Sequence, residues 1–250
     1  MAAAAYRDIK PYLKGIGSSV SRSSALIVIN SYSDHKPIPE NISGCDLYTL
    51  KRSFEKFRLS SGIVNNQYLS IEVKLVDDAS KRGSLSAQAL LAFENAMRQS
   101  RKSTNDLRDL ATRDPVASKL YGDILLHNKR VNEATQMYRQ VVEWKPEDNN
   151  EIYTDIKDLA LRQLASLTSD PDDRLTYLKQ ITNKTEYPDV CINIGDAIKS
   201  VNIKDSLYYY MKAVGKGSLL AAKKARDIYL TEMPKPELAK ELDLLIKRFT

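Results

Sequence analysis

The chain has 250 residues, 42% of them hydrophobic and 28% charged, and this ordinary balance predicts a folded chain that can bury a core. Its apolar runs, such as residues 25–29, are far shorter than the roughly 20 residues that cross a bilayer, so we expect no transmembrane helix. The net charge of +6 comes without a stripe of Arg or Lys, so the case for binding nucleic acid is weak. The two cysteines lie far apart in the sequence and suggest neither a disulfide framework nor a zinc cluster.

The basic excess lies near the N-terminus, where residues 1–24 hold four basic residues, one acidic residue and several serines. We expect this segment to be a flexible basic tail. The same composition is typical of an organellar transit peptide, although Pro11 and Gly15 interrupt its short amphipathic stretch. Because the cysteine usage suggests a reducing compartment, we expect a cytoplasmic location, and a mitochondrial location is the alternative.

Residues 25–106 predict a small α/β unit. The β-branched run 25–29 is typical of a buried strand, and 69–76 alternates apolar and polar residues as a second strand would. Helices are expected after each strand, the first capped by Asp46 and carrying an apolar stripe, and the second starting at Ser84 or Ser86. Strands that alternate with helices favour a parallel α/β arrangement.

The same region resembles the opening of a caspase-like or metacaspase-like domain. The resemblance rests on the first strand, the Gly-Cys-Asp segment at 44–46 and the Val-Asp-Asp segment at 76–78, in that order. The family's cysteine nucleophile needs a histidine from a Ser-Gly-His-Gly loop, and this chain has no such loop and only His35 and His127. The resemblance therefore implies an inactive, truncated form. An ordinary βαβα unit accounts for the same segments.

From residue 107 to 250 the strand pattern gives way to helices joined by short polar turns. Six residues within 115–148 stand at the spacing of one tetratricopeptide repeat, which is about 34 residues long: Gly122, Leu125, Ala134, Tyr138, Val141 and Pro146. The segment resembles that family, which implies a helical hairpin in which Gly122 and Ala134 allow close approach and Tyr138 fills the seam. An ordinary helical hairpin is the alternative.

A second pair with the same spacing starts at Gly195. It would place four further residues at marker positions: Ile198, Leu207, Met211 and Val214. Helices at 151–168 and 172–184 match the repeat poorly, and 219–230 and 236–249 are expected to close the stack. We therefore predict an α/β unit at 25–106 followed by a solenoid of tetratricopeptide-like repeats at 107–250.

A repeat solenoid implies a groove lined by the first helix of each repeat, which binds segments of partner proteins. The groove residues predicted from repeat position are Lys119, Asp123, Leu126, His127, Ile192, Asp196 and Lys199. The run Tyr208, Tyr209 and Tyr210 points in three directions on a helix, so at least one ring should face a groove or a partner. Chaperone-binding members of the family hold a terminal carboxylate with Lys and Asn, and Asp123 in place of that Asn would repel it.

The sequence thus predicts a non-catalytic scaffold subunit of a larger assembly, a pseudoenzyme that needs no metal and no cofactor. One alternative is an organellar ribosome-associated or RNA-associated subunit that uses the basic N-terminal half. The other is a caspase-like cysteine peptidase, which would have to pair His127 with Cys191.

Overall fold

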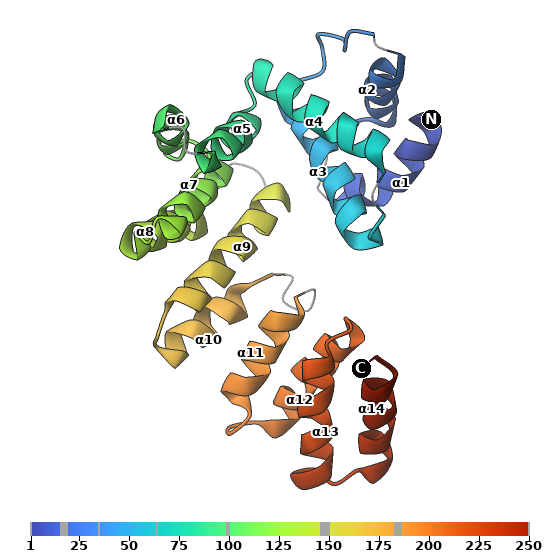
Figure 1. The fold of residues 1–250 in the computed structure, drawn as a ribbon, viewed down its shortest axis with the longest axis vertical. Helices are drawn as coiled ribbons and strands as arrows, with labels where there is room; N and C mark the ends of the chain where they lie inside the picture. Colours follow the sequence, from blue (N-terminus) through green and yellow to red (C-terminus); the bar gives the residue numbers. More distant parts are fainter. Residues whose placement is uncertain are drawn as a thin grey trace. The chain divides into compact units, whose positions relative to one another are not determined.

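The computed structural model describes residues 2–15, 20–34, 36–63, 65–98, 101–145, 151–182 and 187–249. All regular structure within these ranges is helical, and they contain no strand (Figure 1). Two compact units divide the chain, Met1–Ile156 and Lys157–Thr250, which we call unit 1 and unit 2. None of the described helices is long and apolar enough to cross a membrane.

Unit 1 contains eight described helices and the start of a ninth. They are α1 (Ala2–Gly15), α2 (Arg22–Asp34), α3 (Gly44–Ser61), α4 (Asn66–Lys81), α5 (Leu85–Met97), α6 (Arg101–Leu110), α7 (Pro115–His127) and α8 (Val131–Glu143). Helix α9 (Glu151–Leu167) runs from unit 1 into unit 2. Unit 2 continues with α10 (Pro171–Gln180), α11 (Pro188–Ile198), α12 (Ile203–Gly215), α13 (Leu219–Thr231) and α14 (Pro236–Phe249). The predicted boundary between residues 106 and 107 lies inside unit 1.

The predicted α/β unit is wrong, beginning with its first strand. Residues 25–29 lie in α2, where Ala25, Val28 and Ile29 are fully buried while Ile27 is 45% exposed. This spacing of three and four residues is the period of a helix and not of a strand. Ser21 starts the helix, because its hydroxyl accepts a hydrogen bond from the backbone N–H of Ser24.

The second predicted strand, 69–76, is also helical and forms part of α4. The side chain of Asn65 accepts a hydrogen bond from the backbone N–H of Gln67 and caps the helix. Ile71 and Leu75 face the core at helical spacing, whereas Val73, an inward residue in the strand interpretation, is 70% exposed. With neither strand present, the caspase-like half-sheet is absent from the described residues, and an all-helical fold replaces it.

Within the predicted basic N-terminal segment, α1 packs against α2 and α3. Ala5 and Ile9 of α1 have no exposed surface and Leu13 has 6%, so one face of the helix belongs to the core of unit 1. Asp8 accepts a hydrogen bond of 2.8 Å from the hydroxyl of Tyr68 on α4. Pro11 lies on the exposed side of α1, where its ring does not disturb this packing.

Candidate partner-binding surface

The α7/α8 pair is built around one glycine and one tyrosine. A Cβ atom on Gly122 would lie 2.8 Å from the Cε1 atom of Tyr138, so only glycine lets the two helices approach this closely. Ala134, Tyr138 and Val141 have no exposed surface. The hairpin predicted at 115–148 is confirmed over the described residues, and Pro146 lies outside them.

The α11/α12 pair repeats this seam. A Cβ atom on Gly195 would lie 2.7 Å from the Cε1 atom of Tyr210, which is 1% exposed. Ser206 takes the place that Ala134 has in the first pair, and its hydroxyl donates a hydrogen bond of 2.8 Å to the carbonyl oxygen of Gly195. Each pair therefore closes its interior with a ring packed on a glycine backbone.

The predicted register of α12 is wrong by one residue. Equal spacing had placed Leu207, Met211 and Val214 in the seam, where the structure has Ser206, Tyr210 and Ala213 (all at most 1% exposed). Met211 is instead 40% exposed. Helix α11 ends two residues sooner after its glycine than α7 does, and the following turn is one residue longer, so the tyrosine arrives one residue earlier.

An aspartate follows each seam glycine and accepts a hydrogen bond from the seam tyrosine. The hydroxyl of Tyr138 donates to Asp123 at 2.8 Å, and that of Tyr210 donates to Asp196 at 2.6 Å. Burial and this hydrogen bond raise the pKa of Tyr210 to about 12. Burial and the charge of Asp123 likewise raise the pKa of Tyr138 above its ordinary value.

The charged residues of the predicted groove are engaged in ion pairs within their own units. Lys119 pairs with Asp123 at 2.6 Å on α7. On α11, Asp196 pairs with Lys224 at 2.8 Å, and Lys199 pairs with Glu232 at 2.9 Å. The Lys119 ammonium is thus held by a carboxylate beside it, which opposes binding of a second carboxylate at that position.

The other three predicted groove residues, Leu126, His127 and Ile192, differ in their exposure to solvent. Leu126 is half-buried, His127 is exposed in the last turn of α7, and Ile192 is 9% exposed. Leu126 and His127 therefore offer a small apolar and polar surface on α7. Ile192 belongs mainly to the core of unit 2.

The three consecutive tyrosines separate as their helical positions require. Tyr210 fills the seam, Tyr209 is half-buried against the core of unit 2, and Tyr208 is 52% exposed. Residues two apart on a helix point about 200° away from each other, so Tyr208 points away from the side of α12 that meets α11. The rings of Tyr208 and Tyr209 meet edge to face with centroids 5.4 Å apart.

The sequence prediction missed two lysines beside Tyr208 and assigned the neighbouring Met211 to the seam. Lys204 and Lys212 precede and follow Tyr208 by four residues, and all three side chains are exposed. The Nζ atom of Lys212 lies 5.3 Å from the centroid of the Tyr208 ring. We define Lys204, Tyr208, Met211 and Lys212 as the α12 face. Their spacing of four, three and one residues was a visible signal of one shared helix side.

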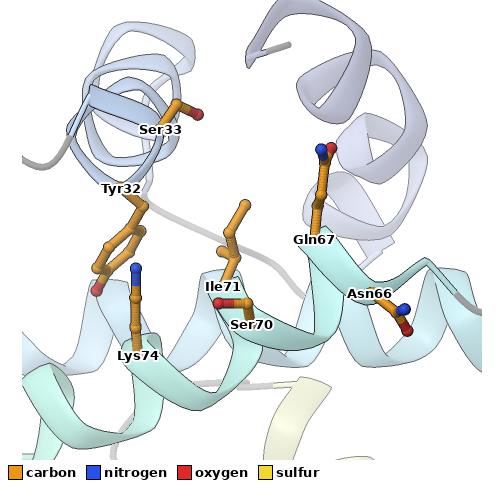
Figure 2. Close-up of a pocket in the computed structure, with 7 residues that line it drawn as sticks. All are labelled: Tyr32, Ser33, Asn66, Gln67, Ser70, Ile71 and Lys74. Carbon is orange, nitrogen blue, oxygen red and sulfur yellow. The ribbon is translucent and has the colours of Figure 1, made fainter.

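A pocket of about 330 Å³ lies between α2 and α4 in unit 1. Figure 2 shows Tyr32 of α2 and Lys74 of α4 side by side within it, with Ile71 between them and Gln67. The hydroxyl of Tyr32 donates to Asp78 at 2.8 Å, and burial together with this bond raises the pKa of Tyr32. The seven lining residues are polar and apolar groups around one ammonium, and they contain no paired general acid and base.

The residues of the peptidase alternative are placed in different units. His127 belongs to unit 1, and His35 lies outside the described residues. Cys191 belongs to unit 2, whose sequence contains no histidine, and it has no exposed surface. Cys45 is exposed on α3. Within the described part of the chain, no group of three or more His, Cys, Asp or Glu residues could hold a metal ion.

No protein-family model matches the chain, and no curated protein matches it.

Proposed function

We propose that this chain is a non-catalytic interaction subunit that holds a partner protein with its tetratricopeptide-like helix pairs. The observation that carries the proposal is the exposure of Tyr208 and Met211 on α12, at 52% and 40%, beside a seam that is otherwise closed. A large aromatic side chain left in solvent next to a flexible apolar one is typical of an interface anchor.

The main contact in this proposal lies on the α12 face and not in the predicted groove. The groove charges of α7 and α11 are already neutralised by neighbours, so a partner that used them would first have to break ion pairs such as Lys199–Glu232. Tyr208 needs no such rearrangement. Tyr209 supports its ring from the side, which reduces the rotamer freedom that Tyr208 would lose on binding.

Two further observations favour a binding role over the peptidase alternative. The sulfur of Cys191 is enclosed in the core of unit 2, where a peptide bond could reach it only after the helices had opened. The thiol also lacks a histidine within its own unit. A cytoplasmic location, or a mitochondrial one, is proposed because neither cysteine forms a disulfide and one of them, Cys45, is exposed, as suits a reducing compartment.

The test is affinity isolation of the full-length protein from native extract, followed by mass spectrometry. The variant Tyr208→Ala/Met211→Ala should bind its main partner at least about tenfold more weakly, because truncating an aromatic anchor commonly costs about 2 kcal/mol or more of binding free energy. The matched control is Val201→Ala/Leu244→Ala, which removes two exposed apolar side chains elsewhere in unit 2. Equal recovery of the partner by both variants would exclude the α12 face as the contact.

A further inference from the structure

We infer that the α12 face binds an acidic segment of a partner protein, with an apolar residue of that segment seated against Tyr208 and Met211. This inference rests on the proposed function and adds the chemistry of the partner. It is carried by the position of two lysines, Lys204 and Lys212, on either side of an exposed aromatic ring.

The spacing places charge and ring on one stripe. Residues four apart on a helix lie nearly one above the other, so Lys204, Tyr208 and Lys212 form a single row about two turns long. Met211 lies beside Tyr208 on the same side of the helix, since it is three residues further along. A segment laid along this row would meet an ammonium group, an apolar centre and a second ammonium group.

The two lysines are not neutralised by their own unit. Within the described residues neither Lys204 nor Lys212 forms an ion pair, whereas Lys199, Lys224 and Arg226 are each bound to a carboxylate. The one acidic residue of α12 is Asp205, whose carboxylate accepts a hydrogen bond of 2.8 Å from the side-chain amide of Asn202.

The wider region has the same sign of charge. Residues 199–250 contain 11 basic and 6 acidic residues, so α12, α13 and α14 together are basic. Of the six acidic residues, Asp227 and Asp243 are bound to Arg226, and Glu232 is bound to Lys199. A basic surface attracts an acidic partner and raises its rate of association, and it repels a basic one.

A protein segment fits the α12 face better than a nucleic acid does. Single strands bind by stacking bases on exposed aromatic rings, but Lys212 lies over the Tyr208 ring, 5.3 Å from its centroid, and a base would have to displace it. The face also lacks arginine, which stacks on bases more readily than lysine does. Met211 adds an adaptable apolar contact of the kind that suits a protein side chain.

The test uses three fluorescein-labelled probes and the full-length protein, with binding followed by fluorescence anisotropy. The first probe is a 16-residue amphipathic peptide with a leucine stripe flanked by glutamates, the second is its twin with every glutamate replaced by glutamine, and the third is a 16-nucleotide oligouridine. We expect the glutamate peptide to bind at least about tenfold more tightly than its twin and to weaken as salt is raised.

The variants place the binding on the α12 face. Lys204→Glu/Lys212→Glu should weaken binding of the glutamate peptide by at least about tenfold, and Tyr208→Ala should weaken binding of both peptides. The control Lys240→Glu/Lys247→Glu makes the same change in net charge on exposed positions of α14 and should weaken binding much less. Far-ultraviolet circular dichroism of each variant checks that the helices are retained.

Three outcomes would overturn the inference. The two peptides could bind equally, the α14 control could lose as much affinity as the α12 variant, or oligouridine could bind more tightly than the glutamate peptide and depend on Tyr208. Failure here is separable from failure of the proposed function. If the native partner is still lost with Tyr208→Ala/Met211→Ala while all three probes bind alike, the interaction role stands and the acidic chemistry is wrong.

Discussion

The α7/α8 and α11/α12 pairs have seams of the same construction, but the aspartates of these seams differ in exposure and in their ion-pair partners. In both, a ring packs on a glycine and its hydroxyl donates to the aspartate that follows. Asp123 is 22% exposed and pairs with a lysine of its own helix, whereas Asp196 is 43% exposed and pairs with Lys224 of the next helix. One internal design can therefore serve either a self-contained hairpin or a hairpin tied to its neighbour.

The outer sides of the two second helices differ more than their seams do. Helix α12 exposes Tyr208 and Met211, while the exposed large apolar residue of α8 is Val131 in its first turn. Because the seam residues are constrained by close packing and the outer residues are not, the outer side is where the two pairs can acquire different roles. The comparison thus supports the proposal that α12 is the helix that would meet a partner.

The largest effect is expected from a substitution that tests how tightly α7 and α8 pack against each other. Replacing Ala134 with Arg would force a charged group without a partner into a fully buried site, which should destabilise the pair by about 4 kcal/mol or more. Gln136→Arg, at an exposed position of the same helix, is the control and should change stability by less than about 0.5 kcal/mol. Thermal unfolding and hydrogen exchange of the α7/α8 amides provide the readout, and unchanged protection in Ala134→Arg would contradict this packing.

The next prediction tests the register of α12. Tyr210→Ala removes a buried ring and should destabilise unit 2 by about 3 kcal/mol. Met211→Ala, one residue along and 40% exposed, should cost less than about 1 kcal/mol. Hydrogen exchange of the α11 and α12 amides in the full-length protein distinguishes the two variants. A larger loss from Met211→Ala would restore the register predicted from equal spacing.

A smaller effect is expected at the seam glycines. Gly122→Ala and Gly195→Ala each place a methyl group within 3 Å of a ring atom, which should cost about 1–3 kcal/mol through overpacking, less the roughly 1 kcal/mol that alanine contributes as a helix former. Gly215→Ala is the control, because nothing lies within 4 Å of its added Cβ, and it should be neutral or slightly stabilising. Urea unfolding of the three variants should show similar losses for the first two alone.

Side-chain periodicity predicted much of the helical part of this fold. The helix expected at Asp46 is α3, whose Leu47, Leu50 and Phe54 are at most 1% exposed, although Ser43 caps it and Asp46 lies three residues inside. Of the two serines expected to start the next helix, Ser84 caps α5. The β-branched run 25–29 was wrongly predicted to be a strand. Its local preference for a strand is weak compared with tertiary packing, and the same residues also fit the period of a helix.

The candidate site was predicted only in part. The exposure of one of the three tyrosines follows from helix geometry alone. Which tyrosine is exposed depends on where α11 ends and on the length of the turn that follows it, and fixed repeat spacing gives neither. With the register one residue off, Met211 was assigned to the seam, and the row formed by Lys204, Tyr208 and Lys212 had no reason to be singled out.

The smallest predicted effect sharpens the difference between the two aspartates. Tyr138→Phe and Tyr210→Phe each keep the ring and remove the hydroxyl that donates to the neighbouring carboxylate. Because Asp123 is less exposed than Asp196, losing its hydrogen bond should cost about 1.5 kcal/mol, against roughly 0.5–1 kcal/mol for the second pair. Equal losses in urea unfolding would show that the exposure of the carboxylate does not set the strength of this bond.

The Tyr210→Phe variant also tests how the stability of the protein depends on alkaline pH. A tyrosine whose pKa is raised on folding contributes stability that is complete below the pKa of about 10 in the unfolded chain and is lost as pH rises through the folded value. For Tyr210 that window lies between about pH 10 and about 12. Tyr210→Phe should therefore lose less stability than the wild-type protein across this interval, as measured by hydrogen exchange or urea unfolding at pH 9 and pH 11. Parallel losses in the two proteins would show that Tyr210 ionises in the folded state as readily as in the unfolded one, and that its ring is less enclosed against Gly195 than the structure indicates.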